Sequence, residues 1–190
     1  MKNKISGISL IEVLITILVM AVGMLGVAAL QVKSLNTSQE SYSKSQAVAV
    51  VEGVADLMRT EYEFIHSDET GNNTYSASGN DWCTNPPAKC NSTTCTAEEQ
   101  AQTNIAQTCE ALIATGIPNP KMGAACIDVP TTDADNCSPG SMHIIYASWS
   151  PDVREDTDGS ANLNGPKTRC HTQFGLDESS EDCVFIELIP

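Results

Sequence analysis

An uncharged run near the amino terminus limits what this chain can fold into. Residues 13–30, VLITILVMAVGMLGVAAL, contain no charged side chain, and Thr16 is the only one among them that hydrogen-bonds strongly. A run of this length and composition is typical of a helix that crosses a membrane. Glu12 directly precedes the run, and the leader before it, residues 1–7 (MKNKISG), carries two lysines and no acid.

Hydropathy alone leaves three interpretations of this amino terminus. The first is a secretory signal peptide cleaved behind the apolar run, and the second is a plain signal anchor whose lysines hold the leader inside the cell. Neither accounts for Glu12, because a carboxylate in a membrane helix costs about 2.5–3.5 kcal/mol and usually marks function. The third interpretation is a leader that is removed before the run, so that the apolar helix stays in the protein.

The residues around Glu12 favour the third interpretation. The string GISLIEVLI, residues 7–15, resembles the class III signal of type IV pilins and their relatives, in which a basic leader, a glycine, an apolar residue and a glutamate four positions later coincide. The resemblance implies that a membrane peptidase cuts after Gly7 and that Ile8 becomes the N-methylated amino terminus. Phenylalanine is commonest in the family at that position, so we expect Ile8 to slow or retune processing at most.

Glu12 matches the characteristic glutamate of that family, which implies an assembly contact. After cleavage, Ile8 presents a positive amine, and Glu12 of a subunit offset along the filament would pair with it and neutralise both charges. A buried ion pair sets register more than it adds stability, which suits staggered helical assembly. The alternative is a glutamate that snorkels from a helix end to the lipid headgroups.

The helix is expected to continue beyond the membrane. No proline occurs from Gln31 to Phe64, and the later apolar residues there follow the spacing of a helix with one buried face. We therefore predict one long helix. Residues 8–30 form its transmembrane and filament-core half, and residues 31–65 its amphipathic outer half.

The remaining residues, 66–190, are predicted to form a disulfide-rich globular head. All the cysteines lie there, and their even number behind a membrane-targeting segment favours disulfides formed in an oxidising compartment. They are Cys83, Cys90, Cys95, Cys109, Cys126, Cys137, Cys170 and Cys183. A zinc site or free thiols are the weaker alternative, because no C-x-x-C occurs and the adjacent pair Cys170-His171 is poor geometry for one ion.

Several helices and strands of the head can be predicted from the sequence. Thr96 and Glu99 form a capping-box pattern at the start of a short helix, TAEEQAQTNIAQTCEALIA, and GIPNPKMG follows as a turn cluster. Three runs are typical of strands: Ala124–Val129, Met142–Trp149 and Cys183–Ile189.

These elements predict an α+β, pilin-like fold. A long amino-terminal helix would pack its outer half on a small antiparallel β-sheet, which buries both apolar faces, and disulfides would staple the head. From proximity in sequence we expect Cys126 to pair with Cys137 and Cys170 with Cys183, while the full connectivity stays open.

Charge and motif content exclude several functions. The net charge of −14 disfavours a nucleic-acid partner, because such a surface repels phosphates. No catalytic constellation is present, so we predict that the chain is no enzyme and needs no cofactor. One acidic loop, SPDVREDTDGSANLNG, offers Asp152, Asp156 and Asp158 to calcium, but its spacing departs from the EF-hand pattern and a solvated loop is the stronger alternative.

The order of the predicted elements resembles one group within the pilin family. The run AVGMLGVAALQ, a cysteine-bearing helix, a Gly/Pro turn and strands around YASW together resemble the PilV-type minor pilins. This implies a minor pilin that helps to initiate and assemble a type IV pilus (fimbrium), in support of adhesion and twitching motility. The implied location is the bacterial inner membrane with the head in the periplasm, and then the pilus at the cell surface.

The resemblance also implies a set of partners. They are other minor pilins, the major pilin, the prepilin peptidase, the inner-membrane assembly platform and a tip adhesin. The alternative within the family is a minor pseudopilin of type II secretion, although such heads are usually shorter and poorer in cysteine. An alternative from another class is a signal-anchored periplasmic binding domain, in which Glu12 would have no role in assembly.

Overall fold

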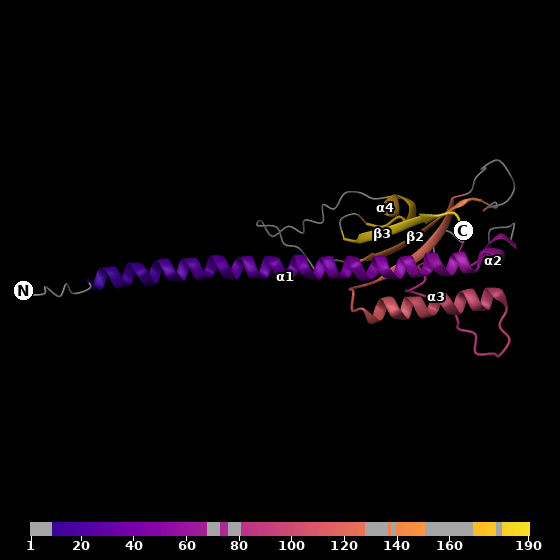
Figure 1. The fold of residues 1–190 in the computed structure, drawn as a ribbon, viewed down its shortest axis with the longest axis horizontal. Coiled ribbons are helices and arrows are strands. Elements are labelled where there is room, and N and C mark those ends of the chain that lie inside the picture. The colour runs from indigo at the N-terminus through magenta and orange to yellow at the C-terminus, as the bar shows by residue number, and fades with distance from the viewer. Residues whose placement is uncertain are drawn as a thin grey trace, which may run out of the picture. The chain divides into compact units, whose positions relative to one another are not determined.

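A long amino-terminal helix and a small antiparallel sheet confirm the predicted α+β fold. The computed structural model describes residues 9–67, 73–75, 81–127, 137, 140–150, 169–177 and 180–190. The chain divides into two compact units, Met1–Tyr42 and Ser43–Pro190. Figure 1 shows its elements, which in chain order are α1 (Leu10–Thr60), α2 (Tyr62–Ser67), α3 (Ala97–Ala114), β1 (Lys121–Ile127), β2 (Met142–Trp149), α4 (Arg169–Phe174) and β3 (Asp182–Leu188).

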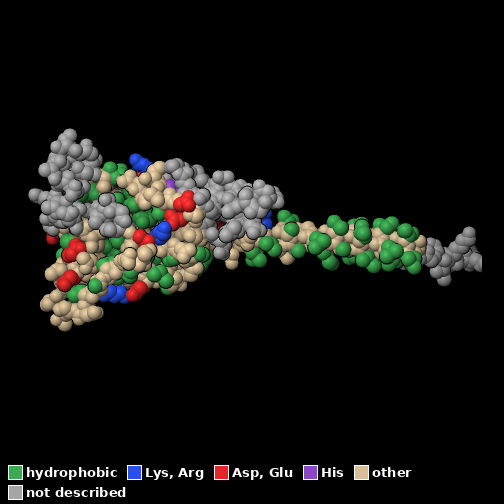
Figure 2. All heavy atoms as spheres, turned by 180° about the vertical axis from the view of Figure 1, so that it is seen from behind, with side chains coloured by type: hydrophobic (Ala, Val, Ile, Leu, Met, Phe, Trp, Pro, Cys, Tyr) green, Lys and Arg blue, Asp and Glu red, His purple; other side chains and the backbone are tan. Residues whose placement is uncertain are grey.

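The described part of the first unit consists chiefly of α1, whose residues from Leu10 to Gln39 are all exposed. Leu18 and Leu25, for example, are 67% and 71% exposed. On the face drawn in Figure 2, hydrophobic side chains cover this apolar stretch. By length and composition, α1 is the one helix in the described residues that can cross a membrane. A helix that is apolar on every side requires lipid or other helices around it.

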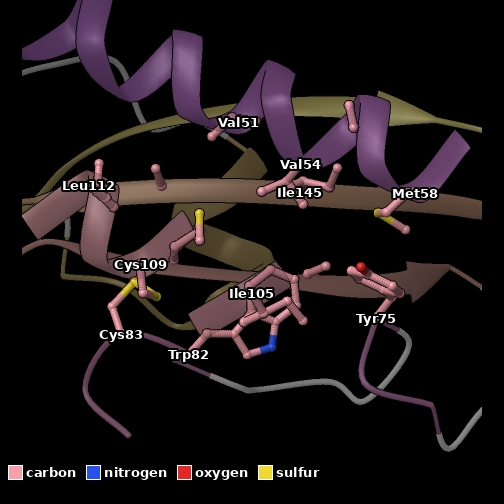
Figure 3. Packing of buried hydrophobic residues seen from close by; sticks show 14 of the residues in the cluster. Val51, Val54, Met58, Tyr75, Trp82, Cys83, Ile105, Cys109, Leu112 and Ile145 are labelled. Atoms are coloured by element: carbon pink, nitrogen blue, oxygen red, sulfur yellow. A yellow bond between two sulfur atoms is a disulfide. The ribbon is translucent and has the colours of Figure 1, made fainter. Parts of the chain in front are cut away.

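The outer part of α1 contributes one face to the core of the second unit. Its buried residues recur at helical spacing, and they are Ala47, Val51, Val54, Ala55 and Met58. Figure 3 shows Val54 beside Ile145 of β2 and Met58 near Tyr75, with Trp82 in the same cluster. Burying a side chain of this size stabilises a fold by about 1.5–3 kcal/mol, so this face anchors the helix in the head.

The helix ends slightly earlier than the sequence predicts. We expected one helix whose outer half reaches residue 65, but α1 ends at Thr60 and α2 begins at Tyr62, with Glu61 between them. At this point the Thr60 hydroxyl donates to the Leu57 carbonyl at 2.8 Å. The path stays almost continuous, because the Glu61 N–H still bonds to the Leu57 carbonyl at 3.0 Å.

The three strands form a meander in the order β1-β2-β3, antiparallel throughout. Ala124 lies opposite Ile145, which in turn lies opposite Ile186, so these side chains share the face that packs into the core. The predicted β2 is confirmed at both ends. The prediction for β1 is wrong at its start, because the strand begins at Lys121 inside the expected turn cluster, where Met122 is fully buried.

The second face of the sheet is also covered. Ile144 and Tyr146 of β2 are buried there, and the Tyr146 ring stacks on Phe174 of α4 with centroids 3.9 Å apart. α4 contacts β3, beside which Figure 1 shows it. The sequence predicts no helix here, since six residues are too few for a periodic signal.

The cap of α3 is confirmed in detail. Glu99 donates its backbone N–H to the Thr96 hydroxyl at 3.2 Å, and the Thr96 N–H donates to the Glu99 carboxylate at 2.8 Å. This reciprocal pair satisfies two donors that would otherwise lack partners at the helix start. The buried face of α3 then contributes Ile105, Cys109 and Leu112 to the core, as Figure 3 shows.

Candidate functional site

Glu12 lies in the first turn of α1 and is exposed. The turn closes through its backbone N–H, which donates to the Ser9 carbonyl at 3.0 Å. Its neighbours Leu10 and Ile11 are 77% and 63% exposed, so the carboxylate stands alone on an apolar surface. No cation among the described residues pairs with it, and the next charged residue along the helix is Lys33.

The side chain of the nearby Thr16, unlike that of Glu12, has a hydrogen-bond partner within the helix. Its hydroxyl donates to the Val13 carbonyl at 2.8 Å within the helix, so its hydrogen-bonding potential is used locally. Glu12 is therefore the one strongly polar side chain between Leu10 and Leu30 that requires an external partner in an apolar environment.

Several predicted site residues lie outside the described part of the chain. Gly7 and Ile8, the predicted processing site, belong to this group. The calcium candidates Asp152, Asp156 and Asp158 belong to it as well, so the calcium site remains a prediction.

The eight cysteines form four disulfides, which confirms the disulfide-stapled head. The pairs are Cys83–Cys109, Cys90–Cys95, Cys126–Cys137 and Cys170–Cys183. The pairings expected for Cys126 and Cys183 are therefore present. Cys83–Cys109 ties the loop after Trp82 to α3 within the core, where Figure 3 shows it. Cys90–Cys95 closes a small exposed loop, which the Cys90 N–H anchors to the Thr103 hydroxyl at 2.9 Å.

A polar network that the sequence analysis missed holds the end of α1 against α3. The Glu61 carboxylate accepts a hydrogen bond from the Tyr75 hydroxyl at 2.8 Å and another from the Asn104 side-chain amide at 2.5 Å. Burial, together with the nearby Glu61, raises the pKa of Tyr75, so the hydroxyl remains a donor. No sequence signal joins these residues, because 14 and 43 positions separate Glu61 from its two partners.

Two of the three histidines lie beside disulfide sulfurs. His143 is buried on β2, with its Nε2 3.6 Å from the Cys137 sulfur. Burial lowers the pKa of His143 to about 4, so the ring is neutral at physiological pH. His171 lies beside the Cys170–Cys183 disulfide, with Nδ1 3.7 Å from the Cys183 sulfur. Neither site was predicted, because cross-strand and helix–strand contacts bring these residues together.

Comparison with known protein families gives a match at the amino terminus. Residues 2–28 match the family described as the prokaryotic N-terminal methylation motif. No curated protein and no solved structure matches the chain. The matched segment contains the leader from Lys2 onward, Gly7, Ile8, Glu12 and most of the apolar run, and it ends before the head begins.

The motif and the fold together support a type IV pilin-like protein, of a pilus or of a pseudopilus. Such a protein associates with other pilin subunits and is a substrate of a prepilin peptidase. Its apolar helix fits membrane anchoring followed by a place in a filament. That role is structural, and the prediction that the chain is no enzyme stays a prediction.

Proposed function

We propose that this chain is a minor pilin, similar to the PilV type, that helps to start assembly of a type IV pilus. The observation that carries the proposal is Glu12, an isolated carboxylate on an apolar, exposed helix within a matched methylation motif. A carboxylate in that setting is costly unless a cation reaches it from another chain. The head supplies the contacts by which this subunit is distinguished from its neighbours.

In this proposal, the processed amino terminus provides the cation. Cleavage after Gly7 gives Ile8 a charged amine, which the Glu12 carboxylate of an adjacent subunit accepts as its partner. The pair removes two charges from lipid and fixes the axial offset between subunits. The prepilin peptidase would act on the leader before this contact can form, so an unprocessed chain would remain in the inner membrane.

The disulfide-rich head favours the pilus over the secretion pseudopilus. The second unit contains four disulfides in addition to its hydrophobic core. Disulfides persist in oxidising compartments, which supports a head in the periplasm and later at the cell surface. Initiating partners in this proposal are other minor pilins, the major pilin, the assembly platform and a tip adhesin.

Deletion of the gene tests the proposed function. We expect loss of surface pili and of twitching, both restored by the wild-type gene, while type II secretion is unaffected. Normal piliation and motility with impaired secretion would instead identify a pseudopilin. If assembly and secretion are both unchanged, the chain is a membrane-anchored periplasmic domain with another role.

Processing can be tested separately by mass spectrometry of the mature amino terminus. We expect a chain that begins at N-methylated Ile8. A mature protein that still begins at Met1 would contradict the cleavage site and, with it, the proposed partner of Glu12.

A further inference from the structure

A cluster of two sulfurs and an imidazole lies where α4 meets β3. Its members are Cys170, His171 and Cys183, whose ligand-type atoms all lie within 4.8 Å of one another. Cys170 and His171 are buried, whereas Cys183 is half-buried. A second set of the same composition, around His143, belongs to the core-facing side of β2. Each set contains one half-buried cysteine, Cys126 in the set around His143 and Cys183 in the α4 cluster. In the α4 cluster, a hydrogen bond to a backbone carbonyl orients the histidine.

The imidazole of His171 is held with one nitrogen facing the sulfurs. Its Nε2 lies 2.9 Å from the Glu181 carbonyl oxygen. A carbonyl only accepts, so Nε2 carries the hydrogen and Nδ1 presents a lone pair toward the Cys183 sulfur at 3.7 Å. Metal-binding histidines are commonly oriented by such a bond from the other ring nitrogen.

The backbone that orients the ring is itself fixed. The Glu181 N–H donates to the Asp177 carbonyl at 2.9 Å, and the Glu181 carboxylate pairs with Lys121 of β1. The carbonyl that holds Nε2 thus belongs to a turn secured at both its main chain and its side chain. The bond to the Glu181 carbonyl therefore adds a restraint on the His171 ring besides the disulfide next to it.

From this arrangement we propose that reduction of Cys170–Cys183 creates a Cys₂His site for a zinc ion. In a tetrahedral site, zinc lies about 2.3 Å from sulfur and about 2.0–2.1 Å from nitrogen, which places ligand atoms roughly 3.6–3.8 Å apart. The 3.7 Å between Nδ1 and the Cys183 sulfur fits this spacing. The two Cα atoms are 6.6 Å apart, near the wide end of the disulfide range, so side-chain rotation separates the sulfurs with little backbone movement.

The chemistry balances with a dithiol as the reductant. The dithiol transfers two electrons and two protons to the disulfide, the S–S bond breaks, and the dithiol becomes a disulfide. Zinc then binds the two thiols as thiolates and the neutral imidazole, with release of two protons. Among the described residues this set supplies three ligands, and water would take the fourth position. An ion held there would keep Cys170 and Cys183 adjacent in a reduced chain and block their pairing with other cysteines.

Cobalt titration of the full chain in detergent, reduced with a water-soluble phosphine, tests the site. Sulfur-to-cobalt charge-transfer absorption reports thiolate ligands, and added zinc should abolish it. We expect the wild type to bind cobalt. A Cys90→Ser/Cys95→Ser control should bind it as well, because the Cys90–Cys95 pair that it removes has no histidine beside it. Affinity should fall at least about tenfold in His171→Gln, and this site's share of the absorption should disappear in Cys170→Ser/Cys183→Ser.

Thermal unfolding followed by circular dichroism provides the second readout. Zinc should raise the Tm of the reduced wild type and leave that of reduced His171→Gln unchanged. The proposal is overturned if His171→Gln binds cobalt as tightly as the wild type, or if the double serine variant keeps the full absorption. Reduction that unfolds the head, without recovery on adding zinc, would overturn it as well.

Discussion

At the scale of single residues, the Tyr75 hydroxyl offers a direct test of the network around Glu61. Tyr75→Phe keeps the ring in the core but removes the donor at 2.8 Å from the Glu61 carboxylate. Because this bond is to a charged group, we expect the free energy of unfolding to fall by about 1.5–3 kcal/mol. Chemical denaturation of the full chain in detergent measures it.

An exposed tyrosine provides the matched control for that substitution. Tyr42 is 59% exposed on α1, so Tyr42→Phe should change the free energy of unfolding by less than about 0.5 kcal/mol. If Tyr75→Phe costs no more than this control, the network contributes nothing measurable to stability.

His143 gives the head a specific dependence on pH. Burial lowers the pKa of this ring to about 4, an effect that nearby His66 increases and a backbone bond at Ser141 opposes. Between pH 6.5 and 4 the unfolded ring binds a proton that the folded ring does not. The free energy of unfolding therefore falls as the pH drops through this window, by up to about 1.4 kcal/mol per pH unit.

The variant His143→Gln isolates this contribution. Denaturation midpoints of the two proteins measured from pH 7 to pH 4 should show a steeper loss for the wild type, because the carboxylates common to both cancel in the difference. Parallel profiles would mean that the ring binds its proton in the folded head as readily as in the unfolded chain.

At the scale of elements, we expect replacement of glycine by alanine to change stability in opposite directions at two positions. Gly116 follows the end of α3 with a φ of 77°, where its N–H donates to the Ile113 carbonyl at 3.1 Å. Alanine is strained in this conformation, so Gly116→Ala should destabilise the head by about 1–2 kcal/mol. Gly53 lies within α1 with open space around it, and Gly53→Ala should stabilise by about 0.5–1 kcal/mol.

Thermal unfolding of the two alanine variants beside the wild type decides this prediction. The same added methyl group meets no neighbour within 4 Å at either position, so the difference in sign reports backbone conformation alone. A Gly116→Ala protein as stable as the wild type would show that the turn after α3 tolerates other conformations.

Elements were predictable wherever a local signal was strong. The Thr96 capping box located α3, and a run rich in apolar, β-branched and aromatic residues located β2 at both ends. The predicted β1 is too short at its start because the sequence places Gly123 in a turn together with the prolines before it. In the structure Gly123 pairs with Tyr146 and belongs to the strand. α4 gave no signal, since its place is set by the Cys170 disulfide and by Phe174 stacking.

Residues of the candidate site could be predicted only where they lie close together in the sequence. The leader, Gly7, Ile8 and Glu12 occupy one short segment, so the motif could be read directly. The contacts of Glu61 and His171 join residues that approach each other only after the sheet and helices have packed. Their geometry is a tertiary property and has no counterpart in sequence spacing.

At the scale of the whole molecule, we expect substitution of Glu12 to impair assembly and to leave folding unchanged. The side chain is exposed and far along the helix from the core residues, the first of which on α1 is Ala47. Glu12→Gln should therefore leave the Tm of the head unchanged, while the amount of this subunit in sheared pili falls at least about tenfold. The physical reason is that an amine left without its carboxylate in an apolar contact costs about 3–5 kcal/mol.

The control is Glu52→Gln, which removes a carboxylate from an exposed position on the same helix. Both variants are expressed in the deletion strain, and pilus fractions are compared with membrane fractions by immunoblotting. Glu52→Gln should enter pili like the wild type, whereas Glu12→Gln should accumulate in the membrane with its amino terminus processed. Equal incorporation of the two variants would show that Glu12 is solvated at the membrane surface. The charge would then be a helix-end feature, and register between subunits would have to come from the head.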